Sequence, residues 1–188
     1  MKRLQVLSNY IKKSSSKGFT LIELLVVVGI LGILAAALIA TIDPFEQLNK
    51  AQDTTMKNLG TEFVSANVRY YGTHSALPWF SAANGGANCY TGGATLSAVT
   101  LSSLTTCLTT LVSDGELKQG YVNAQNLNQL TATNPNPQSG NTTDTIVCFQ
   151  PKSKAQQKDP NTRFTQTGAT GTNCKSTGGT ASCYWCAQ

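Results

Sequence analysis

The chain is poor in the side chains on which most enzyme active sites depend. Its 188 residues include one histidine, His74, and nine acidic side chains, and charged residues make up 12% of the sequence. The sequence has no glycine-rich phosphate-binding loop and no nucleophile elbow. His74 lies among turn-forming residues, where we expect it to be exposed to solvent. We therefore expect a protein that is not an enzyme and that needs no cofactor.

Two further absences divide the chain along its length. Residues 1–18 contain no acidic side chain but carry five of the 14 lysines and arginines, and the remainder balances 14 − 5 = 9 basic against 9 acidic side chains. The net charge of +5 thus belongs to this leader and gives no indication of nucleic-acid binding. The first 88 residues contain no cysteine, whereas six follow, which favours an oxidising compartment for the second half.

A 24-residue apolar run, residues 19–42, follows the leader and contains one charged side chain, Glu23. A helix rises about 1.5 Å per residue, so the run would span about 36 Å, enough to cross a hydrocarbon core of about 30 Å. We therefore predict a single transmembrane helix. Basic residues precede it and Asp43 and Glu46 follow it, so the positive-inside rule places the N-terminus in the cytoplasm and the later residues outside.

An ordinary secretory signal peptide is one alternative, with a cleavage site at the three alanines at 35–37. The apolar run is longer than the about 7 to 15 residues usual for such a peptide, and it continues past the alanines. Glu23 also argues against this interpretation, because a carboxylate at the bilayer centre costs up to about 2.5 to 3.5 kcal/mol. A plain membrane anchor with an incidental glutamate is the other alternative.

The segment KGFTLIELLVVVGILGILAA, which begins at Lys17, resembles the N-terminus of type IV prepilins and pseudopilins. It combines a basic stretch, a glycine, a phenylalanine, a glutamate four residues later and an apolar span. The resemblance implies that a membrane-embedded prepilin peptidase cuts between Gly18 and Phe19 and methylates the new amino group of Phe19. It also implies a structural protein that polymerises with its own copies, assisted by an assembly ATPase and a membrane platform protein.

Cleavage would give Phe19 a free amino group, which is largely charged at neutral pH because the ordinary pKa of an α-amino group is about 7.7 to 8.0. Before cleavage, the sequence offers Glu23 no obvious cation at its own depth in the membrane. Among staggered helices, the ammonium of one subunit can neutralise the Glu23 carboxylate of another. Pairing within one chain is also compatible with the spacing, and the resemblance favours the contact between subunits.

We expect four segments: a leader (1–18), a transmembrane and polymerisation helix (19–42), an amphipathic helical half (43–72) and a globular head (73–188). Asp43 and Pro44 are favoured where a helix starts, so they predict a kink or restart between the halves. If the halves are continuous, residues 19–72 form a rod of about 80 Å. Apolar residues at near-helical spacing, interrupted by Gln52, predict that the second half rests on a sheet. They are Leu48, Met56, Leu59, Phe63, Ala66 and Tyr70.

The expected fold class is α+β, a pilin fold in which the long N-terminal helix packs on a small antiparallel sheet. Residues 72–100 predict an irregular surface loop, and residues 134–144 a turn-rich connector. Leucines from Leu101 to Leu111 predict a short helix, capped by Ser102 or Ser103 and ended near residues 114–115. Three strands are expected, at 145–150, 163–167 and 182–187, with a turn at 158–161 joining the first two.

The six cysteines allow fifteen disulfide pairings. A Cys89–Cys107 bond would tie the loop to the short helix, and the other four share the C-terminal region. They are Cys148, Cys174, Cys183 and Cys186. Disulfides are our preferred interpretation; the alternatives are a zinc site that includes the C-x-x-C pair and a redox motif, although no βαβ pattern surrounds that pair.

A pseudopilin of a type II secretion or competence system is the alternative within the resemblance. Major secretion pseudopilins tend to be smaller, with few cysteines and an acidic calcium loop near the C-terminus. Here the C-terminal stretch holds Asp144 and Asp159 as its acids and four cysteines, which favours a pilin. We expect a membrane precursor and then an extracellular pilus used in adhesion, surface motility or DNA capture; the sequence leaves the head's ligand open.

Overall fold

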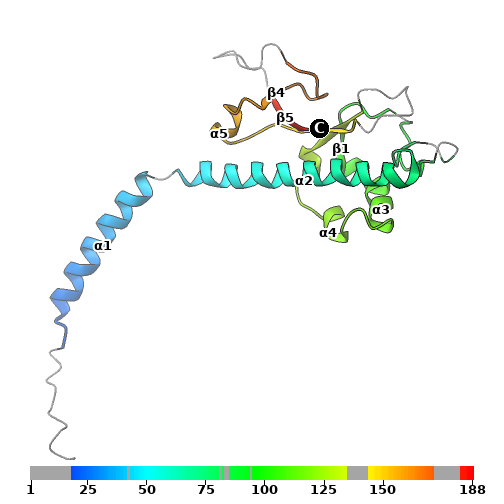
Figure 1. Ribbon diagram of the computed structural model, residues 1–188. Helices are drawn as coiled ribbons and strands as arrows, with labels where there is room; N and C mark the ends of the chain where they lie inside the picture. Colours follow the sequence, from blue (N-terminus) through cyan, green and yellow to red (C-terminus); the bar gives the residue numbers. More distant parts are fainter. Residues whose placement is uncertain are drawn as a thin grey trace, which may run out of the picture. The chain divides into compact units, whose positions relative to one another are not determined.

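The computed structural model covers the whole chain and describes residues 18–41, 43–80, 82, 85–93, 95–134, 144–171 and 183–188. The chain divides into two compact units, with the boundary between Asp43 and Pro44. The first unit contains α1 (Leu21–Thr41), and the second contains α2 (Pro44–His74) and the whole sheet (Figure 1). The basic leader before Gly18 lies outside the described residues, as do most of the predicted 134–144 connector and Cys174.

The predicted helix restart is confirmed. α1 ends at Thr41, Asp43 is not helical, and α2 begins at Pro44. Proline suits the first position of a helix because the N–H that it lacks would have no intrahelical partner there. Residues 19–72 are therefore two helices, and the alternative of one continuous rod is wrong.

One face of α2 is buried against the rest of its unit. Met56, Phe63, Ala66 and Tyr70 are buried as predicted, and Leu59 is partly buried and packs on the same core. Leu48 is 61% exposed, so its assignment to the buried stripe is wrong. The buried face is centred on the row that runs through Met56, Gly60 and Asn67, and Leu48 lies at the margin of that row.

A buried carboxylate holds the start of α2 to the chain that follows the third strand. Asp53 is 3% exposed, and its Oδ2 accepts hydrogen bonds from the Ser153 backbone N–H (2.8 Å) and hydroxyl (2.6 Å). Its Oδ1 accepts one from the Lys152 backbone N–H at 3.0 Å. The sequence does not predict the burial of this residue, because its partners Lys152 and Ser153 lie about 100 residues away along the chain.

The head contains a five-stranded antiparallel sheet with the order β1-β2-β3-β5-β4. Its strands are β1 (Val99–Thr100), β2 (Thr131–Thr133), β3 (Ile146–Phe149), β4 (Thr162–Phe164) and β5 (Tyr184–Ala187). The antiparallel sheet and its last three strands were expected. The expectation of three strands is wrong, since β1 and β2 extend the sheet beyond β3.

The order of the last strands also differs from the expectation. Residues 158–161 do form a turn before β4, but β3 and β4 are not neighbours, because β5 lies between them and pairs with both. The short helix α5 (Lys154–Gln157) occupies part of the same connection. The chain end therefore inserts into the middle of the sheet, and this long-range pairing closes the fold.

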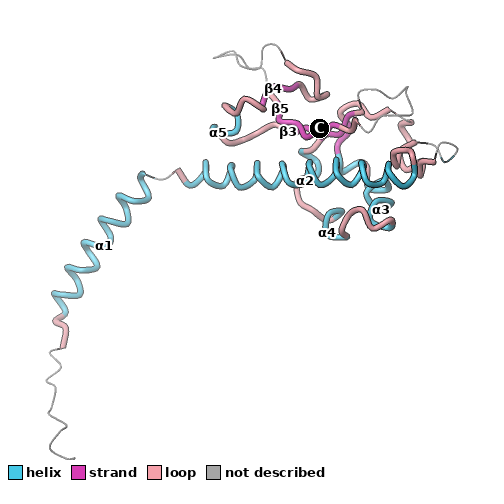
Figure 2. The backbone as a smooth tube through the Cα atoms, viewed as in Figure 1, coloured by secondary structure: helices cyan, strands magenta, loops and turns pink. Residues whose placement is uncertain are grey.

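The short helices α3 (Thr105–Ser113) and α4 (Gln119–Val122) lie on the other side of α2 from the sheet (Figure 2). Two single-turn helices, η2 (Leu101–Ser103) and η3 (Leu127–Gln129), contact each other next to β1. The predicted short helix corresponds to α3, but its N-cap is Leu104, and the two serines belong to η2 without capping α3. The positive φ of Gly115, 78°, follows the end of α3 as predicted.

The segment between α2 and β1 is less superficial than expected. Leu77, Trp79 and Leu96 are buried to 1% exposure or less and join the core of the head. A loop can bury such side chains when larger elements leave a gap for them, and composition alone does not reveal this. The prediction of a surface loop is therefore wrong for these residues.

Candidate functional site

The residues around the predicted cleavage point form a short non-helical segment before α1. Gly18, Phe19 and Thr20 are not helical, and all three are exposed. The Phe19 side chain is 78% exposed, and no described atom lies within 4 Å of the position that a Cβ on Gly18 would occupy. The Gly18–Phe19 peptide bond is therefore accessible, as a protease substrate must be.

Thr20 and Glu23 form a capping box at the start of α1. The Glu23 Oε2 accepts hydrogen bonds from the Thr20 backbone N–H at 2.9 Å and from the Thr20 hydroxyl at 2.8 Å. In return, the Thr20 Oγ1 accepts one from the Glu23 backbone N–H at 3.2 Å, and the Thr20 carbonyl accepts one from the Leu24 N–H. This reciprocal pattern fixes Thr20 as the last residue before the helix.

The capping box changes the expected surroundings of Glu23. The sequence predicts a cation as the partner of Glu23, whereas the structure gives the carboxylate two donors from Thr20. The other carboxylate oxygen, Oε1, accepts no hydrogen bond within the described part of the chain. The T-x-x-E pattern before an apolar run is the known sequence signature of a capping box, so the signal was present and was missed.

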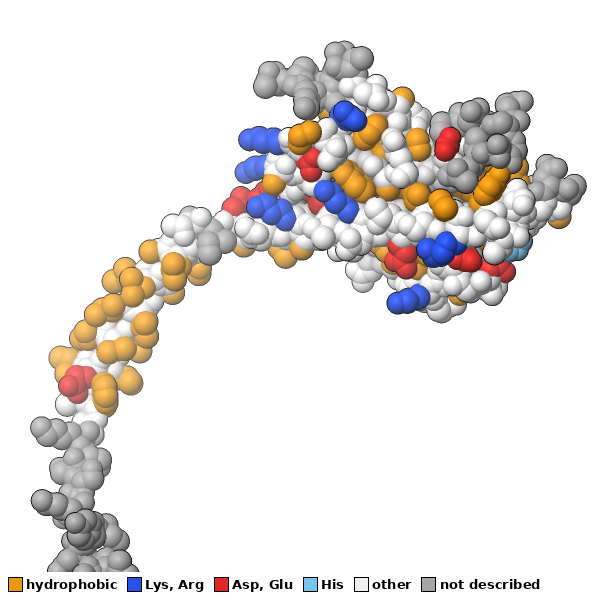
Figure 3. Space-filling view, in the orientation of Figure 1, with side chains coloured by type: hydrophobic (Ala, Val, Ile, Leu, Met, Phe, Trp, Pro, Cys, Tyr) orange, Lys and Arg blue, Asp and Glu red, His pale blue; other side chains and the backbone are white. Residues whose placement is uncertain are grey.

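α1 presents an apolar surface on all sides. Every α1 side chain that the structure describes is exposed, and Figure 3 shows hydrophobic side chains along the visible face of this helix. Residues 21–39 are the one stretch among the described helices that is long and apolar enough to cross a membrane. The predicted transmembrane helix, residues 19–42, therefore coincides with α1.

Comparison with known families identifies this N-terminal region. Residues 13–39 match the family model described as the prokaryotic N-terminal methylation motif. The chain carries a prepilin N-terminus. This motif is the one shared by type IV pilins and pseudopilins, so the resemblance of the N-terminal sequence to prepilins is confirmed. No curated protein and no solved structure matches the chain.

The prepilin motif has coarse functional consequences. It implies processing by a prepilin peptidase and assembly into a filament, and with the apolar α1 it fits a membrane-anchored precursor. The described fold is α+β and pilin-like, with an apolar N-terminal helix, a five-stranded antiparallel sheet and two disulfides. The type IV pilin family, in which this motif occurs, is structural rather than enzymatic.

Four of the six cysteines form two disulfides in the structure. Cys89 bonds to Cys107, which ties the loop to α3 as expected. Cys148 on β3 bonds to Cys186 on β5, and these two residues stand directly opposite each other in the sheet. Because the sulfur of Cys186 is bonded to Cys148, it is not available for a zinc site or a redox C-x-x-C pair with Cys183.

His74 lies at the end of α2 rather than in a loop. Its ring stacks on Tyr70 with the two centroids 4.0 Å apart, and its Nε2 is 3.8 Å from Asp114 Oδ2. Its side chain keeps 38% exposure, so the expected exposure is confirmed although the loop position is wrong. Within the described residues, no three histidine, cysteine or acidic side chains form a group suited to a metal ion.

Proposed function

We propose that the protein is a structural subunit of a type IV pilus-like filament. The observation that carries this proposal is the prepilin motif at 13–39, followed by an α1 whose described side chains are all exposed. An apolar helix without a covering partner requires a bilayer before assembly and the helices of other subunits after it. The bilayer would surround α1 in the membrane precursor, and the helices of other subunits would surround it in the extracellular fibre.

Processing would begin with hydrolysis of the Gly18–Phe19 peptide bond. Water adds across the bond, the Gly18 carboxylate leaves with the leader, and Phe19 keeps a free amino group. The unprotonated form of this amine would then accept a methyl group from a sulfonium methyl donor held by the same peptidase, with release of the thioether and one proton, and the methylated amine would be protonated again at neutral pH. The capping box supports this cleavage point because it starts the helix after Thr20 and leaves the bond outside the helix. A glycine at this position also gives the peptidase the least side-chain bulk.

Assembly would then pair Glu23 with the Phe19 ammonium of a neighbouring subunit. The Oε2 atom of Glu23 is bonded to Thr20, whereas Oε1 has no hydrogen bond within the described residues. The neighbour's ammonium can therefore bind Oε1 without disrupting the cap, and the pair removes the cost of an unpaired carboxylate among apolar helices. The partners of this stage would be other copies of the chain, the platform protein and the cytoplasmic ATPase.

The second unit, residues 44–188, would form the outer part of the subunit, and it would comprise the expected amphipathic helical half (43–72) and globular head (73–188). Its two disulfides support exposure to an oxidising compartment, in agreement with a cytoplasmic N-terminus and an external head. The proposed roles of the filament are adhesion, surface motility or DNA uptake.

A pseudopilin of a secretion or competence system is the second candidate. The acidic calcium loop expected of a secretion pseudopilin is not supported at Asp159, whose Oδ1 accepts a hydrogen bond from the Asn161 backbone N–H at 2.9 Å and whose Oδ2 lies 3.9 Å from Lys57 Nζ. An ordinary signal peptide fits less well, because α1 continues without a break through the alanines at 35–37 to Thr41. Cleavage there would have to open the middle of a helix.

Immunogold electron microscopy tests the filament proposal. An antibody raised against the head should decorate long surface fibres on cells that produce the chain, and shearing should release those fibres with the chain as a component. Label confined to the cell envelope, with no fibre in the sheared fraction, would favour a short pseudopilus or a membrane-anchored protein.

A further inference from the structure

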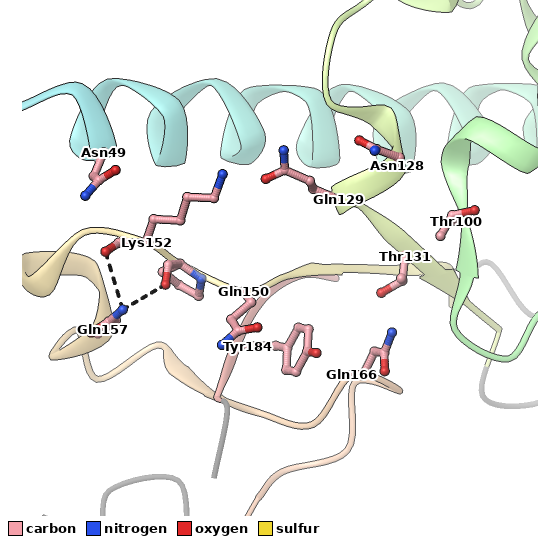
Figure 4. Close-up of a pocket in the computed structure, with 11 residues that line it drawn as sticks. Asn49, Thr100, Asn128, Gln129, Thr131, Gln150, Lys152, Gln157, Gln166 and Tyr184 are labelled. Carbon is pink, nitrogen blue, oxygen red and sulfur yellow. Dashed lines mark hydrogen bonds between the residues drawn. The ribbon is translucent and has the colours of Figure 1, made fainter. Parts of the chain in front are cut away.

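A polar groove of about 690 Å³ lies between α2 and the sheet, wholly within the second unit. Six carboxamide side chains from separate parts of the fold line it (Figure 4). They are Asn49, Asn128, Gln129, Gln150, Gln157 and Gln166. Side chains so far apart in sequence share one surface because α2, η3 and the segments after β3 and β4 converge there.

Most of these amides keep their hydrogen-bonding capacity for a ligand. Within the described residues, the side chains of Asn49, Asn128, Gln150 and Gln166 form no hydrogen bond. Gln157 uses its Nε2 on the Pro151 carbonyl oxygen at 3.0 Å, and its side-chain oxygen stays available. Each unbonded carboxamide offers two N–H donors and an oxygen that accepts, which matches the hydroxyl group, a donor and an acceptor at once.

One aromatic ring adds an apolar surface to the amides. Tyr184 is partly buried, and Figure 4 shows its ring between Gln150 and Gln166 on the sheet side of the groove. A pyranose ring has an apolar C–H face and a rim of hydroxyls. Stacking of that face on Tyr184 would direct the hydroxyls toward the flanking amides.

The charge of the groove excludes strongly ionic ligands. Lys152 is the only charged residue among the described residues that line it, and its Nζ lies 3.4 Å from Gln52 Oε1. A nucleic acid needs several lysines or arginines to neutralise its phosphates, and a cationic ligand needs carboxylates. Both requirements are unmet here.

We propose that this groove binds a neutral oligosaccharide. The binding itself does not depend on processing or polymerisation, because the whole groove belongs to residues 49–184. Filament assays and sugar-binding assays can therefore fail independently. If both assays succeed, the fibre would carry a groove through which it adheres to neutral oligosaccharides.

The binding test uses the full chain in lipid nanodiscs, because maltoside and glucoside detergents carry the chemistry of the proposed ligand. The protein is applied to an array of neutral oligosaccharides built from glucose, galactose, mannose, fucose and N-acetylglucosamine. Polygalacturonate and an oligothymidylate are included as anionic probes. Titration calorimetry then measures the dissociation constant of the most strongly bound glycan.

Variants locate the binding on the protein. Gln150→Ala and Gln166→Ala should each weaken binding about fivefold, the effect of losing one hydrogen bond. Neither side chain is bonded within the described fold, so both variants should fold normally. Tyr184→Ala should weaken binding more than Tyr184→Phe, which retains the ring. Gln119→Ala, an exposed amide on α4 outside the groove, is the matched control and should leave binding unchanged.

The expected result is binding of at least one neutral glycan that weakens in both glutamine variants and not in the control. Three results would overturn the proposal: no neutral glycan bound, binding that Gln150→Ala and Gln166→Ala leave unchanged, or binding of the anionic probes alone.

Discussion

Glu23 and Thr20 are joined by two hydrogen bonds from Thr20 to one carboxylate oxygen, at 2.9 Å from the backbone N–H and 2.8 Å from the hydroxyl. The contact gives Glu23 a local role, since it fixes the first residue of α1 and leaves Gly18 and Phe19 outside the helix. The same carboxylate retains Oε1 for a second partner. One side chain can therefore serve helix capping in the precursor and subunit contact in the proposed filament.

Substitution of Gly18 tests the cleavage point. Gly18→Leu should leave full-length precursor in the membrane, because a bulky side chain at the scissile bond obstructs the peptidase. No described atom lies near this position, so the substitution should not disturb the fold. The measurement is the ratio of precursor to mature chain by immunoblot, with Gly18→Ala as a milder comparison. Normal processing of Gly18→Leu would remove the cleavage assignment.

Glu23→Gln separates capping from charge pairing. Glutamine also occurs at N3 of a capping box, the position that Glu23 holds after the N-cap Thr20. α1 should therefore start at the same residue in this variant, and the peptidase should still cut the precursor. The neutral amide cannot neutralise an ammonium, so the yield of sheared fibres should fall at least tenfold relative to the wild type. Glu62→Gln, an exposed acid on α2, provides a control of equal charge change. Wild-type fibre yield from Glu23→Gln would contradict the pairing mechanism.

The remaining two cysteines give a chemical prediction. Cys89–Cys107 and Cys148–Cys186 account for four of the six. We expect Cys174 and Cys183 to be joined in the exported protein, because cysteines of a secreted domain form disulfides in an oxidising compartment. Peptide mass spectrometry without reduction should find a cross-linked peptide containing both. Alkylation of either thiol in the intact protein would show this prediction to be wrong.

Asp53 should matter for stability more than any exposed acid. Asp53→Ala leaves the Lys152 and Ser153 backbone N–H groups without their carboxylate and should lower the free energy of unfolding by about 3 kcal/mol, as several charge-assisted bonds are lost. Urea denaturation of the mature chain measures the difference. Gln52→Ala, the exposed neighbour, should change it by less than about 0.5 kcal/mol. Equal changes in the two variants would mean that the contact of Asp53 with Lys152 and Ser153 contributes little to the free energy of unfolding.

Local signals predicted the N-terminal half well. Each signal there lies in one continuous stretch of sequence: the methylation motif, the apolar run and the Asp43-Pro44 restart. Motif, hydropathy and helix-start preferences were therefore sufficient to predict these features. Leu48 was misassigned because a single apolar residue fits the margin of a helical stripe as well as its centre. Asp53 was missed because its burial depends on Lys152 and Ser153, about 100 residues away.

The head was harder to predict because its structure depends on long-range pairing. β1 has two residues and β2 has three, too few to show an alternating pattern. β5 inserts between β3 and β4, which no local turn signal encodes. The amide groove is likewise assembled from six separate parts of the chain, and in the sequence its amide residues resemble ordinary surface glutamines and asparagines.

The most direct test is the mass of the N-terminal peptide of the chain in sheared fibres. The account predicts a peptide that begins at Phe19 and carries one methyl group on its amino nitrogen. A chain that begins after the alanines at 35–37, or one that retains the leader, would contradict both the processing site and the proposed pairing of Glu23.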